Sequence, residues 1–309
     1  MASVTLAESA KLSLNMLVSG VIENVITINR FYQLLPFAEI EGNALAYNRE
    51  NVLGDVQYAG VGGTVTAKAA ATFTAVTSSL TTIIGDAEVN GLIQATRSNI
   101  NDQKAIQVAS KAKSLGRKYQ DGLINGDGTS DSFQGLLSLV DPTQTITANA
   151  GGGNGDVLTF AYLDQLIDLV TDKDGQVDYI LMHARTLRSY LALLRALGGN
   201  SASDIMTLPN GEQVPAYRNI PIFRNDYIPI NQTQGSSTAC TTVFAGTLDD
   251  GSMSHGISGI TAANEAAGMQ VEEVGISETK DETITRVKWY CGLALYSLKG
   301  LAALKGVTN

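Results

Sequence analysis

The sequence has few of the residues that carry most enzyme chemistry. It contains two cysteines and two histidines among 309 residues. Cys240 and Cys291 lie far apart without a C-x-x-C motif, so the sequence offers neither a disulfide framework nor a zinc ligand set. His183 and His255 have no serine, cysteine or carboxylate at a motif spacing, and neither H-E-x-x-H nor G-x-S-x-G occurs. We therefore name no catalytic, cofactor-binding or metal-ligating residue and expect no cofactor, although a Ser-His-Asp triad assembled from distant segments stays formally open.

Charge and long apolar runs are also scarce. Charged residues make up 17% of the chain, and their net charge of -9 argues against a groove that grips nucleic acid phosphates. No stretch approaches the roughly 18 apolar residues that a membrane span needs, and the first 25 residues do not read as a secretory signal. These absences predict a soluble cytoplasmic product with no membrane partner. The 44% hydrophobic content suits extensive burial, including burial between subunits.

The first third of the chain predicts one helix and one thin ribbon. Thr5 and Glu8 form a capping-box pattern before apolar residues at helical spacing, which predicts an amphipathic N-terminal helix. Residues 56–84 read as β throughout, with Gly60, Gly62 and Gly63 at the turn of a two-stranded ribbon. Because an isolated two-stranded ribbon is marginal in water, we expect this one to lie against another surface.

A break at residues 86–90 precedes a long amphipathic helix over about residues 91–122. Its apolar residues recur at steps of three and four, and five lysines and arginines fall between them. About 25 helical residues would measure close to 40 Å, which is long for a globular domain and indicates a structural spine.

The segment LINGDGTSDSFQGLL, residues 123–137, collects turn-forming residues where this helical pattern stops. A phosphate-binding loop is excluded because no G-x-x-x-x-G-K-[ST] occurs and these glycines follow a helix. A calcium loop is excluded because the twelfth position of the segment that begins at Asp127 is not acidic. The segment is therefore predicted to be a corner.

The pattern changes after the glycine-rich residues 151–155, which predict a flexible joint. Thr159 is placed to cap a helix that carries Leu163, Leu166, Ile167 and Val170. Strands are expected in VDYILMH, IPIFRNDYIPI and CTTVFAGTL, and a helix in ARTLRSYLALLRALGG. Residues 156–262 thus indicate a compact α/β unit. Two further strands and the short KGLAALKGV strand end the chain, with Val287, Trp289 and Cys291 on one face.

The order of these parts resembles the major capsid protein of tailed bacteriophages, the Hong Kong type fold that encapsulin shells share. Its most specific pieces are the N-G-D-G-T…G-L-L segment after the spine and the C-terminal apolar strand followed by K-G. The resemblance implies an α+β fold with an N-terminal arm and entry to the peripheral domain at 1–43 and an extended β loop at 44–80. It further implies a peripheral domain with the spine helix at 81–150, an axial domain at 151–262, and return strands with the C-terminal strand at 263–309.

The resemblance also implies a function. The chain would self-assemble into pentamers and hexamers of an icosahedral virion capsid, built in the bacterial host cytoplasm around double-stranded DNA without sequence-specific contact. Portal and scaffolding or decoration proteins would be its partners. An encapsulin-like compartment shell is the second hypothesis, and an α/β enzyme using His183 or the Gly151 joint is the third. Some relatives cross-link a ribbon lysine to an asparagine; Lys68 is the one ribbon lysine here, but a solvated lysine is the favoured interpretation.

Overall fold

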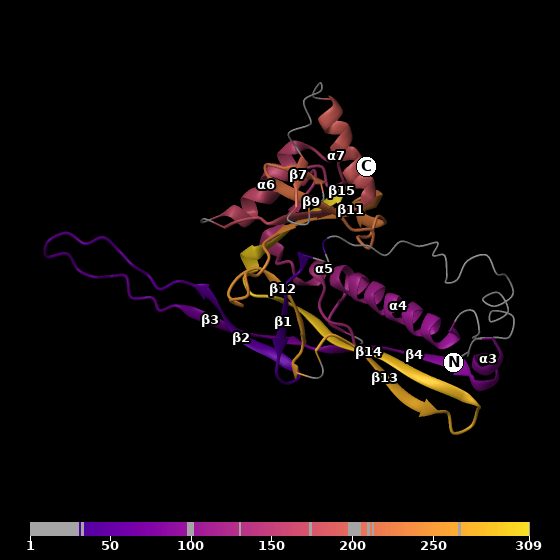
Figure 1. Ribbon diagram of the computed structural model, residues 1–309. Helices are drawn as coiled ribbons and strands as arrows, with labels where there is room; N and C mark the ends of the chain where they lie inside the picture. The colour runs from indigo at the N-terminus through magenta and orange to yellow at the C-terminus, as the bar shows by residue number, and fades with distance from the viewer. Residues whose placement is uncertain are drawn as a thin grey trace.

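The computed structural model describes residues 31, 34–97, 102–129, 131–172, 175–196, 205–208, 211, 213–264 and 267–308. The predicted N-terminal helix lies outside the described residues. Helices and strands are mixed in the described part, as the α+β prediction requires. None of the helices described is long and apolar enough to cross a membrane. The described residues form a five-stranded sheet, an eight-stranded sheet, helices that pack beside them, and a two-stranded ribbon that extends far from the body (Figure 1).

The first sheet is built around one long strand, β14. Its members are β1 (Phe37–Ile40), β4 (Thr81–Asn90), β12 (Ile257–Ala262), β13 (Met269–Ile276) and β14 (Glu282–Leu295). The spine helix α4 (Gln103–Asn125) packs across β4 and β14. Val287, Trp289 and Cys291 are buried, and the Trp289 and Tyr119 rings lie 4.6 Å apart between sheet and helix. The prediction that these three side chains share a buried face is confirmed.

The second sheet holds the α/β unit. Its strands run in the order β5 (Thr145–Thr147), β15 (Leu301–Val307), β11 (Ser237–Gly246), β6 (Tyr179–Met182), β9 (Ile220–Arg224), β8 (Gln213–Tyr217) and β7 (Ile205–Thr207), with β10 (Gln232–Gln234) beside β11. Helices α6 (Phe160–Thr171) and α7 (Ala184–Ala196) accompany this sheet. Thr159 accepts a hydrogen bond from the Tyr162 N–H, and all four apolar residues predicted for α6 are buried. The capped helix is therefore confirmed.

The ribbon pairs β2 (Ala44–Val52) with β3 (Thr72–Ser79) in antiparallel register. Between them, residues 53–71 form a tip that contains no regular strand, so the prediction of β structure throughout residues 56–84 is wrong for its first part. The Gly63 N–H donates to the Gly60 carbonyl at 2.9 Å, with Gly62 at a φ of +80°, so the predicted turn is confirmed.

Three other element predictions need correction. No break occurs at residues 86–90, because β4 continues through them and Asp86 pairs with Arg286 across the strands, with N–O distances of 2.8 and 2.9 Å. The helix predicted over 91–122 is two helices, α3 (Gly91–Arg97) and α4, because Asp102 accepts the first N–H groups of α4 as its N-cap. The strand expected over 220–230 ends at Arg224, because the Asn225 side chain accepts the Tyr227 N–H and bends the chain.

The sheets also exchange strands across the boundary predicted at residue 262. Strand β12 precedes that boundary but pairs with β14 in the first sheet, whereas β15 follows it but lies in the second sheet between β5 and β11. The C-terminal strand β15 therefore belongs to the sheet of the α/β unit and not to the sheet that contains the return strands. Parallel pairing of β15 with β5 joins residues some 150 positions apart, which local patterning cannot show.

Candidate assembly surfaces

The ribbon tip exposes large apolar side chains that no described part of the chain covers. It extends well beyond the body (Figure 1). Leu53 is 75% exposed and Val56 is 89% exposed, while Tyr58 and Val61 are fully exposed. Because isolated proteins rarely display so many large apolar side chains on one segment, the tip has the character of a contact surface.

Gln57 organises the ribbon tip. Its Oε1 accepts the N–H groups of Thr66 and Ala67 at 2.9 and 2.8 Å, and its Nε2 donates to the Thr64 carbonyl at 2.9 Å. The Asp55 N–H also donates to the Ala69 carbonyl. These bonds connect the two sides of the tip in place of the hydrogen bonds that paired strands would form. The tip is thus a defined hairpin end rather than a random loop.

The base of the ribbon is tied to the body through alternate residues of β2. Leu45, Tyr47 and Arg49 are half-buried, whereas the residues between them are exposed. The Tyr47 hydroxyl donates to the Leu295 carbonyl at 2.6 Å, and Arg49 donates to the carbonyls of Leu295 and Tyr296 at 2.6 and 2.9 Å. The alternation of Leu45 and Tyr47 with their neighbours is visible in the sequence, whereas no local signal marks Arg49 as part of this attachment.

The corner predicted in LINGDGTSDSFQGLL joins α4 to the short helix α5 (Leu136–Leu139). The Asp127 carboxylate accepts hydrogen bonds from Thr129 and Ser132, which hold its pKa at about 2, below the ordinary value of 3.8. A Cβ on Gly126 would lie 2.1 Å from the Phe133 carbonyl oxygen, and one on Gly135 would lie 2.4 Å from the Gly122 carbonyl oxygen. The corner is therefore a tight backbone crossing, as predicted.

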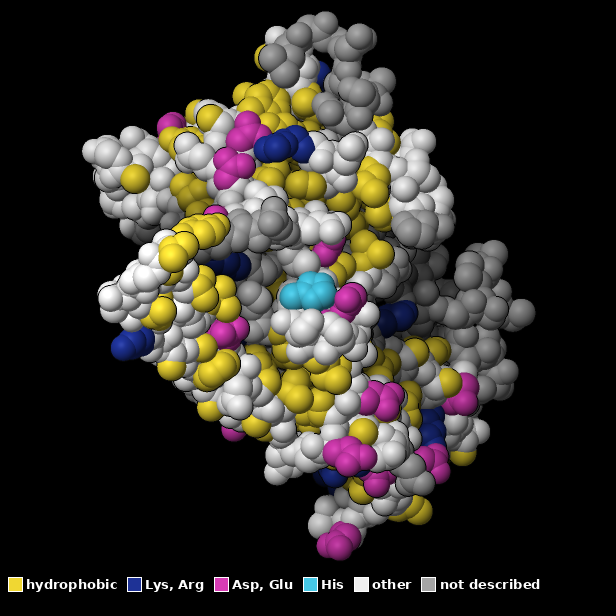
Figure 2. Space-filling model, turned by 90° about the vertical axis from the view of Figure 1, so that its left-hand side faces the viewer, with side chains coloured by type: hydrophobic (Ala, Val, Ile, Leu, Met, Phe, Trp, Pro, Cys, Tyr) yellow, Lys and Arg dark blue, Asp and Glu magenta, His cyan; other side chains and the backbone are white. Residues whose placement is uncertain are grey.

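A second apolar surface lies along β13. Within the described chain, β13 pairs with β14 on one edge only, and it exposes Val271, Val274 and Ile276. Lys104 bonds Glu273 and Lys288 bonds Glu272, and each bond lowers the pKa of its glutamate. The face toward which the ribbon points likewise carries many hydrophobic side chains, with charged ones scattered among them (Figure 2).

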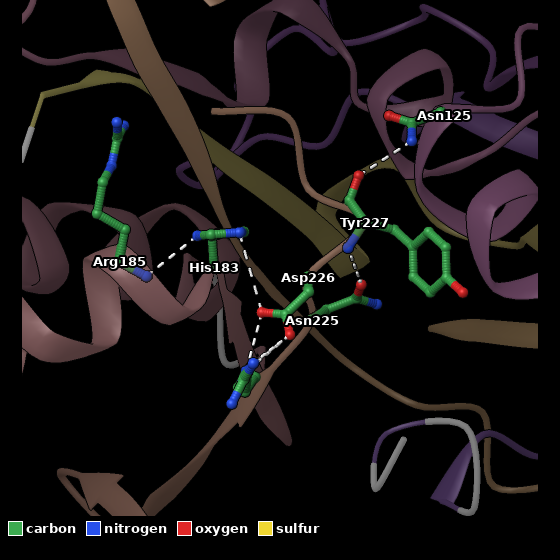
Figure 3. A network of polar contacts seen from close by, with 7 residues as sticks. Asn125, His183, Arg185, Asn225, Asp226 and Tyr227 are labelled. Carbon is green, nitrogen blue, oxygen red and sulfur yellow. Dashed lines mark hydrogen bonds and ion pairs between the residues drawn. The ribbon is translucent and has the colours of Figure 1, made fainter. Parts of the chain in front are cut away.

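His183 lies in a network of polar contacts at the start of α7. Its Nδ1 accepts the Arg185 N–H at 3.0 Å at the start of α7, and its Nε2 lies 3.9 Å from Asp226 Oδ1 (Figure 3). Burial lowers the pKa of His183, which keeps the ring neutral, and the hydrogen bond from Arg224 lowers the pKa of Asp226. Because Nδ1 accepts the backbone N–H, the proton of the neutral ring is on Nε2, and neither nitrogen has a free lone pair with which to deprotonate a nucleophile.

The same network links the two sheets. Asn125 at the end of α4 donates to the Tyr227 carbonyl at 3.0 Å, and Tyr227 directly follows Asp226, which faces His183 (Figure 3). The loop after β9 therefore connects α7 to the spine helix.

The structure also places the other residues that the sequence raised as candidates. His255 lies with Asp249 and Asp250, with ligand atoms within 4.8 Å of one another, but both carboxylates accept N–H groups of their own turn. In the glycine-rich residues 151–155, predicted to be a flexible joint, Asn154 accepts the N–H and hydroxyl of Ser236. A Cβ on Gly155 would lie 2.6 Å from the Gly306 carbonyl oxygen, so this end of the segment packs tightly. Lys68 is exposed on the ribbon tip.

Solved structures with the same architecture are shells. The chain superposes on the holo-SrpI encapsulin complex from Synechococcus elongatus PCC 7942 with a TM-score of 0.73, 18% identity, and coverage of 99% of this chain and 97% of that one. The capsid of cyanophage A-1(L) gives a TM-score of 0.71 at 13% identity, covering 96% and 97%. The capsid of a native GTA particle gives 0.63 at 14% identity, covering 95% of each. These likenesses establish the capsid fold that phages and encapsulins share.

Comparison of sequences identifies the family more specifically than the shared fold does. A search among curated proteins finds no match. The family model described as type 2A encapsulin shell protein SrpI-like matches residues 81–308, about three quarters of the chain, from the start of β4 to the end of the last strand. The chain therefore belongs to the SrpI-like family of type 2A encapsulin shell proteins.

Proposed function

We propose that this chain is the shell subunit of an encapsulin-type protein compartment and that it acts by self-assembly, without catalytic activity of its own. Copies would form pentamers, and hexamers where the shell is large enough to need them. Family membership supports the compartment, and it favours this second hypothesis of the sequence analysis over the phage capsid.

The exposed ribbon tip is the observation that carries the proposal. Its four large apolar side chains have no cover from the residues that the structure describes, and a hydrophobic side chain gains about 1.5–3 kcal/mol when it is fully buried. A neighbouring copy supplies that cover for every subunit at once if the copies are related by rotational symmetry. The ribbon is thus explained as the strap that links a subunit to its neighbour.

The division of labour within the subunit is part of the proposal. Residues 44–80 would form the intersubunit loop, 81–150 with the return strands after 263 the peripheral region, and 151–262 the axial region around the symmetry axes. Residues 1–43 would form the arm and the entry to the peripheral region. The exposed β13 edge fits a further contact between subunits.

A phage or phage-like head is the second candidate function, because two of the similar structures are a cyanophage capsid and a GTA particle capsid. In that case the particles would enclose double-stranded DNA, and portal and scaffolding or decoration proteins would take part in assembly. Nuclease-treated particles decide between the two: protected genome-length DNA supports the head, and its absence with a packaged protein supports the compartment.

A shortened ribbon tests the proposal itself. Residues 53–71 are replaced by Asn-Gly, which can close a hairpin between the paired residues Val52 and Thr72. Lys68→Gln, which changes the same tip without removing an apolar side chain, is the matched control. In negative-stain images we expect closed shells from the control and only subunits or open fragments from the shortened chain. Normal closed shells from the shortened chain would contradict the role of the ribbon.

A further inference from the structure

The base and the tip of the ribbon differ sharply in how they are held. Leu45, Tyr47 and Arg49 on β2 are half-buried, as are Val76 and Ser78 on β3. Beyond Arg49, every residue from Glu50 to Thr66 is exposed. The strand register also shifts between Glu50 and Val52, directly after the last buried position. The attachment of the ribbon to the body therefore ends abruptly at Arg49.

The attachment is made by two side chains that reach the same piece of backbone. Tyr47 and Arg49 together donate three hydrogen bonds to the carbonyl oxygens of Leu295 and Tyr296, where β14 ends. The Arg49 guanidinium lies over the Tyr47 ring, 5.9 Å from its centroid, and this ring meets the Tyr296 ring edge-on at 5.4 Å. Charge-assisted hydrogen bonds from a planar guanidinium fix direction as well as distance.

The receiving surface is rigid. Tyr296 is buried in a small core with Ile40, Ile260 and Ala294, and its hydroxyl shares a hydrogen bond with Ser258 at 2.8 Å. The Tyr296 N–H donates to the Gly256 carbonyl at 3.0 Å. The two acceptor carbonyls are thus held by the first sheet, and the ribbon is oriented relative to that sheet.

We propose that Tyr47 and Arg49 form a clasp that sets the direction in which the ribbon leaves the subunit, and that the ribbon bends immediately beyond it, at Glu50–Val52. A β-bulge increases the local bend and twist of a strand, so this position suits a hinge. Under the proposed function, the clasp would be the positioning device that aims the strap at a neighbouring copy. The clasp itself does not depend on that function.

The test measures the ribbon direction directly. Donor and acceptor dyes are attached to Ala59→Cys on the tip and Glu278→Cys on the loop between β13 and β14, both exposed. Cys240 and Cys291 are buried, and burial raises the pKa of Cys291 to about 12, so they label poorly. Full-length labelled chains are mixed with excess unlabelled chains, so that each particle or subunit reports one ribbon whether or not shells form.

Arg49→Gln should broaden and shift the distribution of transfer efficiencies. The loss of about two hydrogen bonds should raise the fraction of ribbons that point in another direction roughly tenfold. Tyr47→Phe should broaden it less, because one donor is lost and the ring stays. Lys68→Gln, which removes a cation beyond the clasp, should leave it unchanged. Unaltered distributions in both Arg49→Gln and Tyr47→Phe would overturn the clasp. A failure of the wild-type chain to assemble would instead contradict the proposed function, since the transfer distributions are read in either state.

Discussion

Replacing Gly126 by alanine should destabilise the subunit because two backbone segments cross at this residue without room for a side chain. A Cβ would lie 2.1 Å from the Phe133 carbonyl oxygen and 2.6 Å from the Gly122 carbonyl oxygen. Gly126 has a φ of -57°, so the requirement for glycine comes from space and not from the dihedral angle. Because the obstructing atoms are backbone, no side-chain rotation relieves the clash.

The size of the expected destabilisation depends on the packing and the hydrogen bonds that the added methyl group disturbs. Forcing a methyl group into a packed site costs about 1–3 kcal/mol, and each disrupted backbone hydrogen bond adds about 0.5–1.5 kcal/mol. Two such bonds meet at Gly126, whose N–H donates to Gly122 and whose carbonyl accepts the Gly135 N–H. We expect Gly126→Ala to lower the free energy of unfolding by about 2–6 kcal/mol.

Gly116 offers a matched control on the same helix. A Cβ there meets no atom within 4 Å, so Gly116→Ala should stabilise the subunit by about 0.5–1 kcal/mol through lower backbone entropy in the unfolded chain. Urea unfolding of dispersed subunits at one fixed concentration measures both variants without the contribution of assembly. If Gly126→Ala proved as stable as the wild type, the steric explanation of the corner would be refuted.

Two further predictions concern the strands and the α/β unit. The hydrogen bond from Arg286 lowers the pKa of Asp86 below 3.8, so this pair stabilises the folded chain above that value and its contribution disappears as the pH falls through the lower, folded pKa. The difference in the free energy of unfolding between wild type and Asp86→Asn, measured by urea unfolding, should therefore shrink from neutral pH toward about pH 2. A difference that does not change with pH would refute this prediction. Glu88→Gln on the same strand is the control. Thr159→Ala should lower the free energy of unfolding by about 1 kcal/mol because it removes the N-cap of α6. Thr159→Ser should retain most of that stability because it keeps the hydroxyl group. Equal stability of these two Thr159 variants in thermal unfolding would show that the hydroxyl does not cap the helix.

Local chemistry explains why part of the fold was readable from the sequence. Thr159 and the apolar spacing behind it define α6, and the turn residues between Asn125 and Gly135 define the corner, because both depend on groups a few residues apart. The sequence around His183 carries no motif spacing, and the structure shows that its Nδ1 caps the start of α7. The thin ribbon was also evident from its composition and its glycine turn.

Contacts between distant residues explain what was missed. The apparent break at residues 86–90 is a strand because Asp86 faces Arg286, and the C-terminal strand lies in the second sheet because β15 pairs with β5 and β11. The clasp needs Tyr47 and Arg49 to meet carbonyl groups nearly 250 positions away. Such pairings depend on how whole sheets align, and no local pattern records them.

By itself, the sequence determined the helices and turns whose hydrogen bonds join neighbouring residues. Its composition alone showed that cysteine and histidine are scarce. Tertiary structure alone decided which strands share a sheet and which carbonyl groups accept the hydrogen bonds that hold the ribbon. The physical reason is that a backbone hydrogen bond between strands carries no side-chain signature, so its partner is fixed only when the chain has packed.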